Sequence, residues 1–117
     1  MPIADFDQYC QMLTSARAGK YAYPAINVSN LETLTGAIEA FAEAESDGII
    51  QASTGAGQHA SGGLKDMVLG SKILAEAAHQ IADKYNVLIA LHTDHCHPKN
   101  LVPFMDPLIQ ISKDRVA

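Results

Sequence analysis

The chain is poor in features that mark several classes of protein. Its 117 residues include two cysteines and no CxxC pair, which excludes a disulfide framework and predicts reduced thiols. The longest uninterrupted apolar run, Val87 to Leu91, is five residues long, whereas a membrane-spanning helix needs about 20. The opening residues, MPIADFDQ, lack the positive charge and apolar stretch of a secretory signal. We therefore expect a cytoplasmic protein without a membrane span.

Positive charge is also scarce. Eight Lys and Arg residues stand against thirteen Asp and Glu residues, for a net charge of -5. Nucleic acids and anionic membranes select a basic surface, so we expect neither as a partner. A small phosphorylated substrate remains compatible, because it needs only a few backbone N–H groups and one or two cations. Apolar residues make up 48% of the chain, which is enough for the core of a globular domain.

Helical and extended patterns alternate along the chain. Apolar spacing predicts a leading helix from about Phe6 to Gly19, with Asp5 and Gln8 placed as a capping pair. Strand and helix then alternate three times, which is typical of right-handed βαβ units and a parallel sheet. The expected strands are 21–28, 48–53 and 87–91, and the expected helices are 29–44, about 74–85 and about 98–115.

Two segments between these elements carry further local signals. Ser29 and Glu32 form a capping box that predicts the start of the first crossover helix. Residues 54–63, TGAGQHASGG, contain four glycines and predict a flexible surface loop. The loop contains neither GxxxxGK[ST] nor GxGxxG, so it is not a phosphate-binding loop of those types. A mobile loop that closes over a site is the alternative.

Polar side chains follow all three expected strands. Asn27 ends the first, Ser53 ends the second, and Asp94 and His95 follow the third in the segment VLIALHTDHC. The carboxyl ends of parallel strands meet at one edge of a sheet, where ligands bind. Imidazole and carboxylate groups suit zinc, although a catalytic zinc usually takes three protein ligands. The alternatives are a hydrogen-bonded structural histidine, and turn or capping roles for Asn27 and Ser53.

Four motifs together carry a family resemblance. With YPAINVSNLET, SDGIIQASTGAG, GGLKDMV and ALHTDHC, the chain resembles the N-terminal part of a class II, metal-dependent fructose-bisphosphate aldolase. The resemblance implies an α/β fold in which residues 1–117 form the leading helix and the first three βα units of a single TIM (β/α)₈ barrel domain, with the barrel incomplete. It implies reversible cleavage of fructose 1,6-bisphosphate to dihydroxyacetone phosphate and glyceraldehyde 3-phosphate. Alternatives are a tagatose-bisphosphate aldolase of the same family and a non-catalytic α/β module.

The resemblance also implies residue roles. Asp94 would exchange a proton with the C4 oxygen of the sugar, and His95 would be a ligand of a zinc ion (Zn²⁺). Ser53 would contact the glyceraldehyde 3-phosphate half of the substrate, and Asn27 would support the active-site network. The remaining zinc ligands are expected outside this chain. The full-length enzyme is expected to be a homodimer or a larger oligomer.

The length of the chain limits these expectations. A barrel of eight βα units takes about 250 residues. We therefore expect the 117-residue chain by itself to lack aldolase activity and to bind zinc weakly. Three strands would leave open sheet edges and an apolar surface in water, so we also expect aggregation, association or a molten state.

Overall fold

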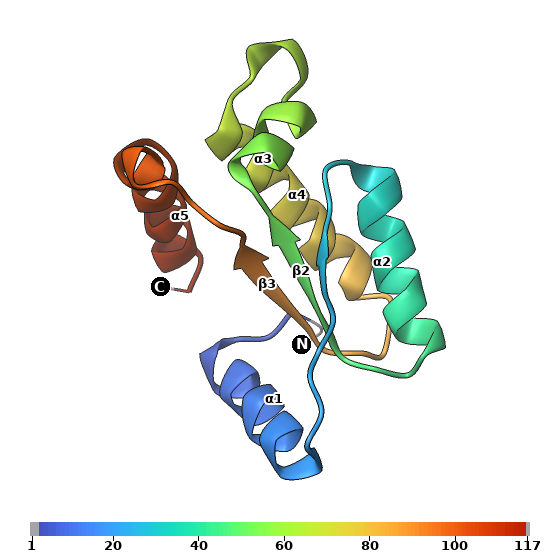
Figure 1. Cartoon of the computed structure of the whole chain (residues 1–117). Coiled ribbons are helices and arrows are strands. Elements are labelled where there is room, and N and C mark those ends of the chain that lie inside the picture. The colour runs from blue at the N-terminus through green and yellow to red at the C-terminus, as the bar shows by residue number, and fades with distance from the viewer. Residues whose placement is uncertain (1–2, 117) are drawn as a thin grey trace.

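The computed structural model describes residues 3–116 and shows a three-stranded parallel sheet flanked by helices (Figure 1). Its elements, in chain order, are α1 (Phe6–Gly19), β1 (Ala25–Asn27), α2 (Leu31–Glu43), β2 (Gly48–Ala52), α3 (Thr54–Ala60), the 3₁₀ helix η1 (Gly62–Leu64), α4 (Met67–Ala82), β3 (Ile89–Thr93), the 3₁₀ helix η2 (Pro98–Asn100), the π-helix η3 (Leu101–Met105) and α5 (Asp106–Val116). The strand order is β1-β2-β3, and both neighbouring pairs are parallel. The predicted leading helix and three parallel βα units are confirmed.

The main core lies between the sheet and the helices α2 and α4. We call this face of the sheet the outer face. Fully burying an aliphatic side chain there stabilises the fold by about 1.5–3 kcal/mol, so this layer holds the three strands together. The buried residues of this core are Val28, Leu34, Ala37, Ile38, Phe41, Ile50, Ala78, Ala82 and Ile89.

The opposite, inner face of the sheet packs against α1. Met12 of α1 is buried with Ile49 and Ala90, near the N-terminal ends of the strands (Figure 1). The helix begins as predicted, because the Asp5 carboxylate accepts the Gln8 N–H at 2.8 Å and the Gln8 side-chain oxygen accepts the Asp5 N–H at 3.1 Å. Helix α1 therefore covers the part of the inner face near the amino ends of the strands and reaches toward their carboxyl ends only at Tyr9.

The start of α2 differs by one residue from the prediction. The helix is capped by Asn30, whose side-chain oxygen accepts the Thr33 N–H at 2.8 Å, and Thr33 bonds back to the Asn30 N–H. The predicted Ser29 and Glu32 pair is wrong. Asn30 is the extended residue directly before the helix, with φ of -156°, and therefore its side chain can reach the free N–H groups of the first turn.

The first strand is shorter than predicted. It has three residues rather than the eight of 21–28. Pro24 lies directly before it and has no N–H to donate, although its carbonyl accepts the Ile49 N–H at 2.9 Å. Pairing therefore starts only at Ala25, which lies opposite Ile49.

The third strand is shifted by two residues from the predicted 87–91. Leu88 lies outside the strand, and its N–H is bonded to the Asp47 carboxylate at 2.8 Å instead of to a neighbouring strand. At the other end, Gln51 pairs with His92 and Ala52 pairs with Thr93. Two polar residues of the HTDHC segment are therefore part of the sheet and not of the loop after it.

The glycine-rich segment 54–63 is ordered, so the predicted flexible loop is wrong. It forms α3 and continues into η1. Ser53 caps α3 by accepting the Ala56 N–H at 3.1 Å. The low helix propensity of glycine is overcome by packing, because α3 lies directly on α4 at Gly57 and Gly70.

The C-terminal segment, predicted as one helix over about 98–115, is broken into η2, η3 and α5. Pro103 lies in the π-helix η3, and α5 starts only at Asp106. Phe104 of η3 is fully buried and anchors the segment. Within residues 3–116, every helix is too short or too polar to cross a membrane.

Candidate active site

Three polar side chains form one hydrogen-bonded chain at the carboxyl end of the sheet. The Asn27 side-chain N–H donates to the Asp94 carboxylate at 2.8 Å, and the Gln51 side-chain N–H donates to the Asn27 oxygen at 2.8 Å. Asn27 and Gln51 are direct register partners on β1 and β2. The Asp94 N–H also donates to the Ala52 carbonyl at 2.9 Å, so the backbone at Asp94 still follows the sheet. Each of the three strands therefore contributes to holding the Asp94 carboxylate.

These contacts control the charge of Asp94. The pKa of its carboxyl lies below the ordinary value, first because the Asn27 amide donates a hydrogen bond and next because the His95 backbone N–H donates another. Both bonds stabilise the ionised form, and partial burial opposes them with a smaller effect. Asp94 is therefore ionised at neutral pH, which is the form that can accept a proton.

His95 is the residue whose chemistry suits a zinc ligand. It directly follows Asp94, and its side chain is exposed to solvent. Imidazole is a common zinc ligand, but a catalytic zinc usually needs three protein ligands. Within residues 3–116, no three His, Cys, Asp or Glu side chains are arranged to hold a metal ion. His95 can therefore supply one ligand of a site that needs further ligands.

His92 has a structural contact that the sequence did not reveal. Its Nε2 atom lies 3.0 Å from the Tyr9 hydroxyl, and the two rings meet edge-on with centroids 5.3 Å apart. Tyr9 belongs to α1, so this pair joins the leading helix to β3. For His92, the contact supports the structural alternative over metal binding.

Ser53 lies at the same edge of the sheet, one residue beyond β2. Its hydroxyl oxygen accepts the Ala56 N–H, as expected for a helix cap. The side chain is half-buried. Because capping uses only the oxygen as an acceptor, the hydroxyl proton can still be donated to a ligand. The capping role and a substrate-binding role are therefore compatible.

Gln51 is a member of the cluster that was not predicted from the sequence. It is the one long polar side chain in the strand GIIQA, and it lies two residues before Ser53. Side chains two apart on a strand share a face, so this spacing was the available signal.

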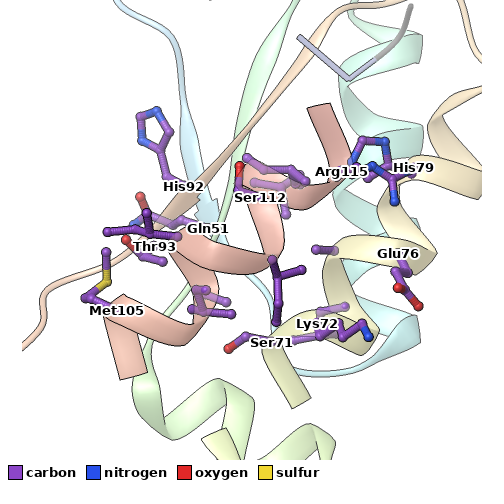
Figure 2. Close-up of a pocket in the computed structure, with 18 of the residues that line it drawn as sticks. Gln51, Ser71, Lys72, Glu76, His79, His92, Thr93, Met105, Ser112 and Arg115 are labelled. Carbon is purple, nitrogen blue, oxygen red and sulfur yellow. The ribbon is translucent and has the colours of Figure 1, made fainter. Parts of the chain in front are cut away.

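A groove of about 630 Å³ lies on the other side of the sheet, between α4 and α5 (Figure 2). Its walls are mainly apolar, and the His92 ring points away from it. His79 and Arg115 lie together at one end. Burial, followed by the charge of Arg115, lowers the pKa of His79. Gln51 and His92 also line this groove, so the groove adjoins the Asp94 cluster at Gln51.

Comparisons with known proteins agree with this geometry. A family model described as class II fructose-bisphosphate aldolase matches residues 7–113. The chain is 54% identical over 117 residues to the fructose-bisphosphate aldolase of Streptomyces coelicolor, covering 99% of the chain and 34% of that protein. It is 52% identical over 118 residues to the Mycobacterium tuberculosis aldolase, covering 100% of the chain and 34% of that protein. The crystal structure of the Campylobacter jejuni aldolase matches with a TM-score of 0.87 at 33% identity, covering 92% of this chain and 31% of that one.

Parallel βα units with polar side chains at the carboxyl ends of the strands define part of a TIM-barrel-type enzyme. The chain belongs to the class II fructose-bisphosphate aldolase family. It spans about a third of the length of the curated relatives it matches. The three strands accordingly form an incomplete barrel.

Proposed function

We propose that this chain is one part of a single TIM-barrel domain of an aldolase that reversibly cleaves fructose 1,6-bisphosphate to dihydroxyacetone phosphate and glyceraldehyde 3-phosphate. The main support for this proposal is the 2.8 Å hydrogen bond from the Asn27 side chain to the Asp94 carboxylate. It keeps an ionised carboxylate at the sheet edge where barrel enzymes bind their substrates. Membership of the aldolase family supports the choice of substrate.

The proposed role of Asp94 follows from the chemistry of cleavage. The C3–C4 bond breaks when the C4 hydroxyl loses its proton, because the C4 oxygen then becomes the aldehyde of the departing product. The bond electrons move toward the C2 carbonyl of the other half. Asp94 accepts the C4 proton, and in the reverse direction it returns that proton to the C4 oxygen. Asn27 holds the carboxylate in place and in its basic form.

The proposed metal is zinc, with His95 as one ligand and the other ligands outside this chain. Held by His95 and further ligands, zinc would supply Lewis-acid stabilisation of the negative charge that develops at the ketose carbonyl. Asp94 and His95 are adjacent in the chain. This suits proton transfer by Asp94 and metal binding by His95, because both roles serve one small substrate. The chain by itself should bind zinc weakly, since residues 3–116 bring no three ligands together.

The remaining proposals concern the substrate and the setting. Ser53 would donate its hydroxyl proton to the glyceraldehyde 3-phosphate half. The enzyme would be a cytoplasmic enzyme of glycolysis and gluconeogenesis, and a homodimer or larger oligomer when full length. Its partner is a small sugar bisphosphate and not nucleic acid or a membrane, in keeping with the net charge of -5.

A chimaera provides the test, because the chain spans a third of its relatives. Residues 1–117 replace the matching part of the Streptomyces coelicolor aldolase. We expect the chimaera to cleave fructose 1,6-bisphosphate and to lose activity with a chelator, and we expect the 117-residue chain by itself to be inactive. An inactive but folded chimaera would favour a non-catalytic α/β module. For the choice of sugar, the test is the rate at which the full-length enzyme cleaves tagatose 1,6-bisphosphate and fructose 1,6-bisphosphate, and faster cleavage of the tagatose sugar would reassign the substrate.

A further inference from the structure

The helices α3 and α4 are in backbone contact at two glycines. A Cβ atom on Gly70 would overlap the carbonyl oxygen of Gly57, and a Cβ atom on Gly57 would overlap the carbonyl oxygen of Met67. A Cβ atom on Gly57 would also lie 2.6 Å from the Ser71 hydroxyl oxygen. Carbonyl groups of a helix cannot rotate away as a flexible side chain can. Only glycine at both positions therefore allows the two helices to approach this closely.

Helix α4 is the fixed member of this pair. Its residues Leu74, Ala78 and Ala82 are buried, and the last two belong to the outer-face core. At its start, the Asp66 carboxylate caps the helix by accepting two backbone N–H groups at 3.0–3.1 Å. Helix α3, by contrast, contributes no side chain to either apolar cluster of the described residues. The position of α3 is therefore determined by its contact with α4.

Two hydrogen bonds connect Ser53 to the first turn of α3. The Ser53 hydroxyl oxygen accepts the Ala56 N–H at 3.1 Å, and the Ser53 carbonyl accepts the Gly57 N–H at 3.1 Å. Gly57 is thus hydrogen-bonded to Ser53 on one side and in contact with α4 on the other. A displacement of α3 at Gly57 would be transmitted to Ser53 within one helical turn.

We propose that Gly57 and Gly70 are positioning residues that set the location of the Ser53 hydroxyl at the sheet edge. The proposal rests on the proposed function, in which Ser53 contacts the glyceraldehyde 3-phosphate half of the substrate. The glycine pair determines how deeply α3 sits on α4, and that depth determines whether Ser53 can reach this half. The pair acts through Ser53 and does not itself touch the substrate.

The test uses Gly70→Ala and Gly57→Ala in the aldolase chimaera. The matched control is Gly36→Ala, because Gly36 is also in a helix but a Cβ atom there would meet nothing within 4 Å. We expect each of the two contact variants to raise KM for fructose 1,6-bisphosphate by about tenfold or more, since small displacements of a binding group are costly. The control should keep the parent KM. Of the two contact variants, Gly57→Ala is the one expected to keep the fold, because α3 lies outside both apolar clusters.

Ser53→Ala then separates positioning from a general loss of stability. It should raise KM in the parent and add little in the Gly70→Ala background, since the serine is already displaced there. Unchanged KM in both glycine variants, with a raised KM for Ser53→Ala, would overturn the proposal. The proposal would also be overturned if the increases in KM caused by Ser53→Ala and by Gly70→Ala multiplied in the double variant. If Ser53→Ala leaves KM unchanged, the proposed substrate role of Ser53 fails, and the positioning proposal fails with it.

Amide hydrogen exchange gives a readout that does not depend on activity. Peptides covering 53–60 should exchange faster in both contact variants, while the buried part of α4 should keep the parent rates. Unchanged amide exchange rates in 53–60 would contradict the claim that Gly57 and Gly70 determine the position of α3 on α4. Because exchange is measurable in an inactive chimaera, failure of the proposed function remains distinguishable from failure of this contact.

Discussion

The two faces of the same three strands differ in what they contribute. On the outer face, Val28, Ile50 and Ile89 are almost fully buried under α2 and α4. One residue before Val28 and one after Ile50, Asn27 and Gln51 lie on the inner face, where their hydrogen bonds lead to Asp94. Successive side chains on a strand point to opposite faces. Neighbouring residues of one strand can therefore belong to the core on the outer face and to the candidate site on the inner face.

This comparison predicts that substitutions on the two faces have different consequences. A change on the outer face should lower the free energy of unfolding and affect activity only through the amount of folded protein. A change on the inner face near the carboxyl ends should affect activity while the fold persists. Variants of both faces are best measured in the aldolase chimaera.

The largest effect is expected at Asp94. Asp94→Asn keeps the shape of the side chain but removes the basic carboxylate, so kcat should fall about 10²- to 10⁴-fold. The thermal unfolding temperature should stay near that of the parent, because the side chain lies at the uncovered edge of the sheet. Steady-state kinetics and a melting curve measure the two quantities. A kcat close to that of the parent would exclude Asp94 as the proton-transfer group.

The outer face should respond in the opposite way. Ile89 is fully buried, so Ile89→Ala should lower the free energy of unfolding by about 2–5 kcal/mol. The matched control Ile89→Val removes one methylene group and should cost about 0.5–1.5 kcal/mol. Urea unfolding measures both values. The folded fraction should keep the parent KM, and a changed KM would show that the two faces are not independent.

The third prediction concerns the pKa of Asp94. Asn27→Ala removes the main hydrogen bond that stabilises the ionised carboxylate, so the pKa should rise toward its ordinary value. The acid limb of the pH profile of kcat/KM should then move to higher pH. Gln51→Ala is the control, because Gln51 reaches Asp94 only through Asn27 and should cause a smaller shift in the same direction.

The same shift has a consequence for stability. Since the pKa of Asp94 is lower in the folded state, its contribution is fully present above the unfolded value of about 3.9 and is lost as the pH falls through the folded value. The difference in the free energy of unfolding between the parent and Asn27→Ala should therefore shrink below about pH 4. A difference that stays constant across this range would mean that Asn27 acts on the fold without affecting the charge of Asp94.

The elements on the outer face were the easier ones to predict from the sequence. Apolar periodicity located α2, β2 and the later part of α4, because burial against a core imposes a regular spacing on the chain. Helix α4 begins at Met67, seven residues before the predicted start at Leu74. The segment 54–63 was predicted wrongly as a loop, since its helix depends on a contact between Gly57 and Gly70 that lies thirteen residues apart in sequence. Local glycine content carries no information about such a contact.

The site was predictable only in part. The ends of the strands placed Asn27, Ser53 and Asp94 at one edge, because parallel strands all end there. The hydrogen bond between Asn27 and Asp94 spans 67 residues and depends on the register of the sheet, so the sequence did not reveal it. The pairing of His92 with Tyr9 required knowledge of where α1 packs.

The smallest effect is expected at this last pair. Tyr9→Phe keeps the ring but removes the hydroxyl that lies 3.0 Å from His92, and it should lower the free energy of unfolding by about 1 kcal/mol. The control Tyr21→Phe removes an exposed hydroxyl whose contact with Tyr23 is 3.4 Å long, and it should change little. If Tyr9→Phe lowers kcat at unchanged stability, His92 belongs with the chemical part of the inner face. A loss of stability alone would give His92 a structural role, and Asp94 would then be the first residue of this segment that belongs to the site.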